Sequence, residues 1–96
     1  MNSLDNTGTR LSTFLVEQYW TGVTAEEFDD AAERVRRSAE EIADDGIRIR
    51  FLHSTLVPDE ETALCVIEAE SAAAVEDAFA RAAVRFERIV EARTGG

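Results

Sequence analysis

The chain has 96 residues, a formal net charge of −10 and a hydrophobic content of 45%. This length suits one domain with a modest core, and this composition is that of a globular chain and not a disordered one. The negative charge argues against nucleic acid and anionic membranes as partners, because both are bound through basic surfaces.

No apolar run approaches the roughly 20 residues of a membrane span. Residues 1–11 lack the pattern of a secretory signal, and the single cysteine, Cys65, forms no internal disulfide. We therefore predict a cytoplasmic protein.

The first predicted strand is Ser12–Trp20, and the polar segment before it, 1–11, is expected to be a disordered tail. The Thr, Phe, Val, Tyr and Trp residues of the strand favour a pleated, half-buried surface. Because side chains alternate along a strand, Glu17 shares one face with Leu15 and Tyr19. An acid in the middle of an apolar strand makes Glu17 the first candidate for a functional residue.

A helix is predicted next, from the capping box Thr24–Glu27 to a terminal glycine, Gly46. Apolar residues recur at helical spacing and form one stripe: Phe28, Ala31, Ala32, Val35, Ala39 and Ile42. The acidic residues of its first half suit the helix macrodipole. We interpret them as a solvated face and not as a metal site.

Two strands and a second helix follow. Ile47–Leu56 and Thr62–Ala69 are joined by a short connection containing the only proline, so the two strands are expected to be antiparallel. Ser71 fits the N-cap of a helix, and Phe86–Ala92 reads as a final strand before the tail 93–96. The order β-α-β-β-α-β predicts an α+β, ferredoxin-like domain over 12–92, with a four-stranded antiparallel sheet and both helices on one face.

Four short segments add a family resemblance through their order and spacing: FLVEQYW at 14–20, FLHSTLV at 51–57, CVIEA at 65–69 and FERIVE at 86–91. Together they resemble the DUF4242 family of small bacterial ferredoxin-like proteins over residues 13–92. The resemblance implies the same fold, a dimer as in many relatives, and a link to metal, because at least one relative is described as nickel-binding. The chain departs from the family at Ala83–Arg85, where it lacks the usual glycine and proline, so a longer helix or a different loop is expected there.

The face of the sheet away from the helices is expected to carry the functional residues. We expect the helices to cover one set of side chains: Phe14, Val16, Leu52, Leu56, Leu64 and Val66. The open face would then carry the other set: Leu15, Glu17, Tyr19, Phe51, His53, Thr55, Cys65 and Ile67. Such a face is too apolar to stay in water, which predicts a homodimer, an α+β barrel with an interior cavity.

Three interpretations of this surface remain open. In the first, Glu17, His53 and Cys65 hold a transition metal such as nickel, or form with Tyr19 and Phe51 a pocket for a small molecule. With one histidine per chain, no multi-histidine site arises within a single chain. In the second, the dimer has no ligand, and Cys65 is a small buried hydrophobic residue. In the third, Glu17 or His53 is the general base of a cofactor-independent cyclase, isomerase or monooxygenase, and an apolar cavity raises the pKa of Glu17. A binding role is favoured over an enzymatic one.

Overall fold

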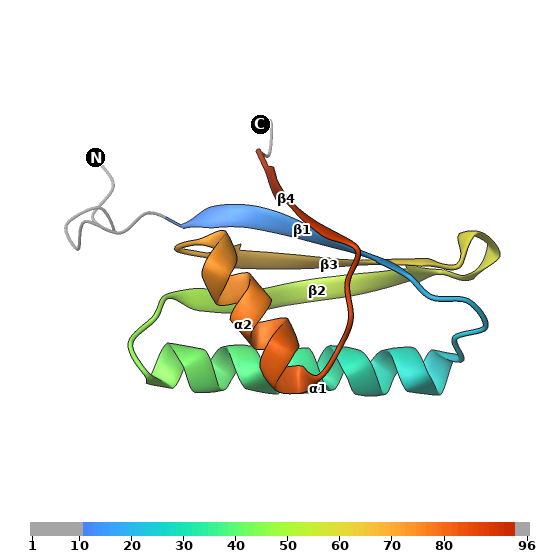
Figure 1. Ribbon diagram of the computed structural model, residues 1–96, viewed down its shortest axis with the longest axis horizontal. Helices are drawn as coiled ribbons and strands as arrows, with labels where there is room; N and C mark the ends of the chain where they lie inside the picture. The colour runs from blue at the N-terminus through green and yellow to red at the C-terminus, as the bar shows by residue number, and fades with distance from the viewer. Residues whose placement is uncertain (1–10, 94–96) are drawn as a thin grey trace.

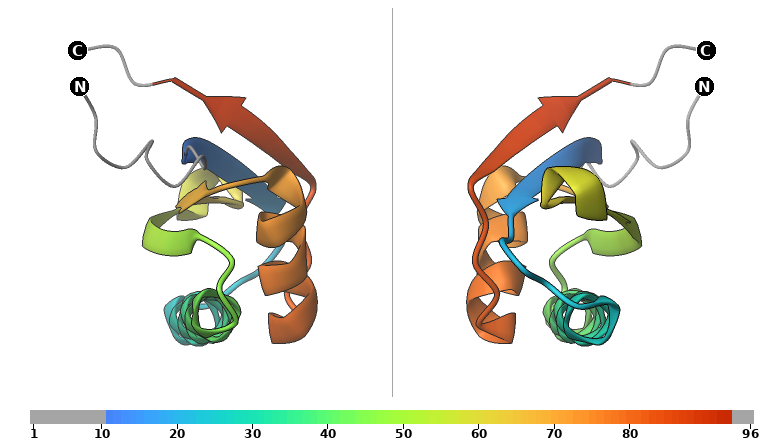
Figure 2. Two further views of the ribbon diagram at one scale, coloured as in Figure 1. Left: turned by 90° about the vertical axis from the view of Figure 1, so that its left-hand side faces the viewer. Right: turned by 90° about the vertical axis from the view of Figure 1, so that its right-hand side faces the viewer.

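The computed structural model describes residues 11–93, and these form one antiparallel sheet with two α-helices on one of its faces (Figures 1 and 2). The elements are β1 (Ser12–Tyr19), α1 (Ala25–Asp44), β2 (Ile49–Val57), β3 (Thr62–Ala69), α2 (Ala72–Ala82) and β4 (Arg88–Ala92). The strand order is β2-β3-β1-β4, so β1 and β3 are the central strands. The predicted α+β, ferredoxin-like fold is confirmed. The tails expected at 1–11 and 93–96 lie outside the described residues, apart from Leu11 and Arg93.

Helix α1 begins at the predicted capping box. The hydroxyl of Thr24 accepts a hydrogen bond from the backbone N–H of Glu27 at 3.1 Å, and the carboxylate of Glu27 accepts one from the N–H of Thr24 at 2.9 Å. The helix ends before Gly46, whose φ of +97° suits a glycine. Its acidic residues pair with arginines along the exposed side, for example Asp30 with Arg34 and Glu40 with Arg36. These acids therefore form the solvated face that the sequence predicts.

Strand β2 contains a β-bulge that the sequence pattern did not reveal. Phe51 pairs with Ile67 of β3 and His53 pairs with Val66, which leaves Leu52 as an extra residue without a partner. Because a bulge shifts the alternation of side chains, Phe51 faces the helices while His53 faces away from them. The prediction that Phe51 and His53 share one face is therefore wrong, and Leu52 is exposed instead of covered by the helices.

The buried and open faces of strand β3 are the reverse of those predicted. Cys65 and Ile67 are buried in the core beneath the helices, whereas Leu64 and Val66 lie on the open face. Every residue from Ala63 to Ile67 is apolar. Alternation of hydrophobic and polar side chains therefore carries no information on which face is buried.

The segment after α2 takes a loop form and does not extend the helix. Ala83 adopts the left-handed conformation with a φ of 57°, its N–H donates to the carbonyl of Ala80, and the N–H of Val84 donates to that of Phe79. This is a Schellman cap with alanine where glycine is usual, at a cost of about 1–2 kcal/mol. Strand β4 begins at Arg88, two residues later than predicted, because 84–87 is irregular.

Candidate functional site

The open face of the sheet consists of the side chains that point away from the helices. By register and alternation these are Thr13, Leu15, Glu17 and Tyr19 of β1, Arg50, His53, Thr55 and Val57 of β2, Thr62, Leu64, Val66 and Glu68 of β3, and Arg88, Val90 and Ala92 of β4. One row across the four strands is His53, Val66, Leu15 and Val90. The next row is Thr55, Leu64, Glu17 and Arg88. The centre of the open face is thus apolar, with polar groups around it.

Glu17 lies on the open face as predicted, but its partner is an arginine of the last strand. Arg88 Nε donates to Glu17 Oε1 at 2.8 Å and Arg88 Nη2 donates to Oε2 at 3.0 Å, a two-point contact between neighbouring strands. The hydrogen bond from Arg88 lowers the pKa of Glu17. The prediction of a raised pKa in an apolar cavity is therefore wrong for this chain. A search for opposite charges across β1 and β4 would have found the pair.

A titration of Glu17 by carboxyl-detected NMR should give a pKa below its ordinary value of 4.5. Because the folded-state pKa is depressed, the pair stabilises the fold at neutral pH, and this contribution is lost as the pH falls through the folded-state pKa. Arg88→Gln should move the pKa of Glu17 upward. Arg50→Gln is the matched control, because Arg50 pairs instead with Glu68 at 2.8 Å. A pKa for Glu17 that Arg88→Gln leaves unchanged would contradict the assignment.

Cys65 lies on the other side of the sheet from Glu17 and His53. Its side chain is 2% exposed, and its Sγ donates to Gln18 Oε1 at 3.7 Å. Burial raises the pKa of the Cys65 thiol to about 12, so the group is protonated at neutral pH, whereas a metal binds the thiolate. The prediction that Cys65 shares a metal-binding surface with Glu17 and His53 is therefore wrong. Its position agrees with the interpretation as a small buried hydrophobic residue.

His53 and Tyr19 remain accessible on the open face. His53 is exposed on the edge strand β2, and Tyr19 is 65% exposed at the end of β1. Strand β3 separates His53 from Glu17, and no hydrogen bond joins the two side chains. Within residues 11–93, no three or more His, Cys, Asp or Glu side chains gather into a group that could hold a metal ion. One copy of this part of the chain therefore offers no cluster of three such donors.

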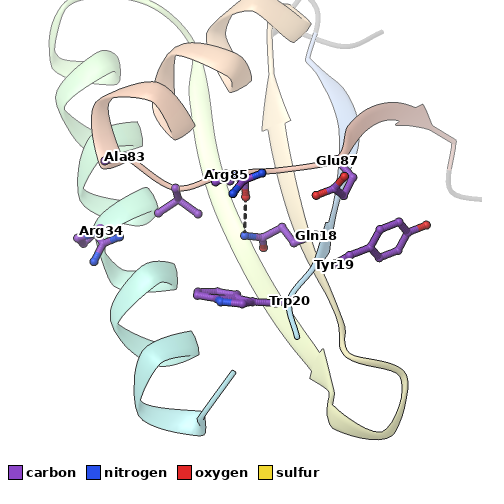
Figure 3. A pocket seen from close by; sticks show the side chains of 8 residues that line it. Gln18, Tyr19, Trp20, Arg34, Ala83, Arg85 and Glu87 are labelled. Carbon is purple, nitrogen blue, oxygen red and sulfur yellow. Dashed lines mark hydrogen bonds between the residues drawn. The ribbon is translucent and has the colours of Figure 1, made fainter. Parts of the chain in front are cut away.

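A cavity lies where β1 ends, and the sequence pattern did not predict it. It has a volume of about 260 Å³ and lies between the end of β1, helix α1 and the segment that follows α2 (Figure 3). Its lining is Gln18, Tyr19, Trp20, Arg34, Ala83, Val84, Arg85 and Glu87. The only signal in the sequence was the departure from the family pattern at Ala83–Arg85. None of the helices in the described part of the chain is long and apolar enough to cross a membrane.

The fold and the two surfaces define a small ferredoxin-like α+β domain with one sheet face packed by helices and the other uncovered. A family model described as nickel responsive protein, SCO4226-like, matches residues 14–92, and the chain belongs to this family. The crystal structure of SCO4226 from Streptomyces coelicolor A3(2) is similar, with 21% identity and a TM-score of 0.69 over 88% of this chain and 100% of that chain. At this identity the likeness shows the fold alone. None of the curated proteins matches the chain.

Proposed function

We propose that the protein is a homodimer that binds a transition metal, with nickel as the first candidate, through donors that both copies supply on the open face. The observation that carries the proposal is the exposure of the only histidine on the uncovered sheet face of a chain that belongs to a nickel-responsive family. Imidazole is a ligand that suits nickel.

The open face has the composition of an interface between copies. Leu15, Leu64, Val66 and Val90 lie side by side at its centre, and no element of the described chain covers them. A two-fold axis would pack the same patch of each copy against the other, as two sheets do face to face. An antiparallel sheet tolerates a solvated face when that face is polar, and the centre of this one is not.

The charges on the open face also favour self-association. The whole chain has a net charge of −10, so most pairs of its surfaces would repel each other. On the open face, however, the charged side chains are Glu17 with Arg88 and Glu68 with Arg50, two pairs that sum to zero. Packing two such faces together brings no excess of like charge into contact.

The donor set of one copy does not fit a nickel site, because the described residues of one chain bring together no cluster of ligands. Dimerisation doubles each donor, so His53 of both copies would supply two imidazoles, with Glu17 as the candidate carboxylate of the same face. Glu17 is held by Arg88, so this carboxylate is free to bind a cation only if that contact is released. Cys65 takes no part, because its thiol is buried and protonated.

Isothermal calorimetry with nickel on protein without a histidine tag tests the proposal. We expect one nickel ion for two chains. His53→Ala removes a ligand, so the affinity for nickel should fall by at least the roughly 10–100-fold that is lost when a residue hydrogen-bonded to a metal ligand is removed. Binding should also weaken in acid, because protonated imidazole does not bind a metal. Copper and zinc, tested in parallel, define the preference among metals.

Cys65→Ala is the control variant, because it removes the other soft donor without touching the open face. It should bind nickel as the wild type does. Equal affinity of the wild type and His53→Ala would contradict the site. If the wild type formed a dimer but bound none of the three metals, the second interpretation, a dimer without a ligand, would be supported. In the third interpretation Glu17 has no support as the general base, because Arg88 makes this carboxylate a weaker base, and His53 is then the candidate that is left.

A further inference from the structure

We infer that the cavity beside the end of β1 is a binding site for a small aromatic monocarboxylate. This inference depends neither on the metal nor on the dimer, because the cavity is formed within one copy by residues of β1, α1 and the segment after α2 (Figure 3). Its volume of about 260 Å³ is just below the range of about 300–1,000 Å³ typical of small-molecule sites. The cavity therefore suits a single ring with a short substituent.

Trp20 provides the apolar wall of the cavity. Its indole is half-buried and packs against the core cluster, and its backbone N–H donates to the carbonyl of Glu61 at 2.8 Å. The side chain is thus held from both the core and the backbone. A ring held in this way offers a face on which a second aromatic ring can stack.

Two guanidinium groups line the same cavity, and they differ in how they are held. Arg34 is fixed, because its Nε donates to the carbonyl of Ala82 at 3.1 Å and it pairs with Asp30. Arg85 has no ion pair and no side-chain hydrogen bond within residues 11–93. Arg93 likewise has no ion pair within residues 11–93, but only Arg85 of these two arginines lines the cavity. A guanidinium without an ion-pair partner at a cavity wall favours the binding of a ligand that carries a carboxylate.

Gln18 fixes the position of the segment that carries Arg85. Its side chain is 5% exposed; Oε1 accepts from Cys65 Sγ and Nε2 donates to the carbonyl of Arg85 at 3.0 Å. A side-chain amide has two N–H groups, and the described residues provide an acceptor for only one of them. The second N–H is therefore free to donate to an oxygen atom of a bound molecule.

Glu87 limits the charge of the ligand. Its carboxylate also lines the cavity, so a second negative charge on the bound molecule would be repelled. Glu87 can accept a hydrogen bond from a hydroxyl or amino group on the ring. The combination of one flat apolar wall, one unpaired guanidinium and one acid selects a single carboxylate on a ring.

The indole of Trp20 reports on the cavity directly, because it is the only tryptophan in the chain. We would titrate metal-free protein with benzoate and follow the indole N–H signal of Trp20 by NMR. Benzamide has nearly the same shape without the charge and is the matched probe. Benzoate should give a saturable shift, and benzamide should bind about tenfold or more weakly, because hydrogen bonds to a charged group are the stronger ones.

Arg85→Gln should reduce the affinity for benzoate about tenfold or more. Arg93→Gln is the control, because it removes the same charge at the end of the sheet away from the cavity, beyond Ala92, which pairs with Thr13. Thermal melts establish that both variants fold. Val66→Asp, which is designed to prevent dimerisation, should bind benzoate like the wild type, so failure here and failure of the metal proposal are distinguishable.

Three results would overturn the inference: no saturable shift of the Trp20 signal with benzoate, equal affinity for benzoate and benzamide, or equal affinity of Arg85→Gln and the wild type. An equal loss in Arg93→Gln would show a general effect of net charge and would also overturn it. If Arg85→Gln did not fold, the comparison of benzoate with benzamide on the wild type would still decide.

Discussion

Replacing Val66 by Asp should convert the proposed dimer into a monomer. Val66 lies at the centre of the open face between His53 and Leu15, so the two-fold axis would place two new carboxylates in an apolar interface. An ionised carboxylate without a partner costs several kcal/mol to bury, which is enough to prevent association of a small domain. The side chain of Val66 is only half-buried in one copy, so the domain itself should still fold.

Sedimentation equilibrium at micromolar concentration measures this effect. Ala73→Asp is the matched control, because it adds the same charge at an exposed position in the first turn of α2, where the helix dipole favours an acid. It should remain a dimer. A wild-type protein that sediments as a monomer, or a Val66→Asp variant that sediments as a dimer, would contradict the proposed interface. Phe51, which the sequence placed on this surface, packs against the core, so Phe51→Asp would test folding instead.

Phe79→Ala should lower the free energy of unfolding by about 3–5 kcal/mol. Phe79 is 0% exposed and is the largest of the fully buried side chains, and its ring meets that of Phe86 edge to face with 5.5 Å between centroids. Such a loss is a large part of the 5–15 kcal/mol that is typical of a domain. The change keeps the backbone carbonyl of Phe79, which accepts from the N–H of Val84, but it removes the ring that meets Phe86, so it should loosen the segment that lines the cavity.

Urea denaturation followed by circular dichroism provides the free energies. Phe28→Ala is the control, because Phe28 lies half-buried at the start of α1. The substitution therefore removes the same side chain from a less enclosed position. Its effect should be clearly smaller than that of Phe79→Ala. A loss of less than about 1 kcal/mol in Phe79→Ala would show that this ring does not hold the helix on the sheet.

The order of elements could be predicted because each boundary has a local chemical cause. The capping box at Thr24, the glycine at Gly46 and the N-cap at Ser71 act over three or four residues, and all three lie where the sequence placed them. Glu17 was placed correctly because β1 alternates strictly. These features depend on neighbours along the chain.

The composition of the candidate site could be predicted only in part, because it depends on contacts between distant segments. Cys65 was placed on the wrong face because β3 is apolar on both sides, and only the packing of α1 and α2 decides which side is buried. Arg88 was missed because it lies 71 residues from Glu17 along the chain. The cavity was missed because it depends on the conformation of Ala83, which local propensity disfavours.

The bulge at Leu52 decides on which side of the sheet the only imidazole of the chain lies. Ile49 and Phe51 point toward the helices, so an uninterrupted strand would bury His53 beneath them as well. The extra residue reverses the alternation of the side chains that follow it, so His53 lies on the open face. A single-codon deletion of Leu52 would remove only the extra residue and would leave His53 opposite Val66 on the open face, with the residues up to Val57 in their present orientation. The pairing of β2 with β3 after the bulge therefore sets the orientation of the imidazole, and a β2 strand one residue shorter would keep it on the open face.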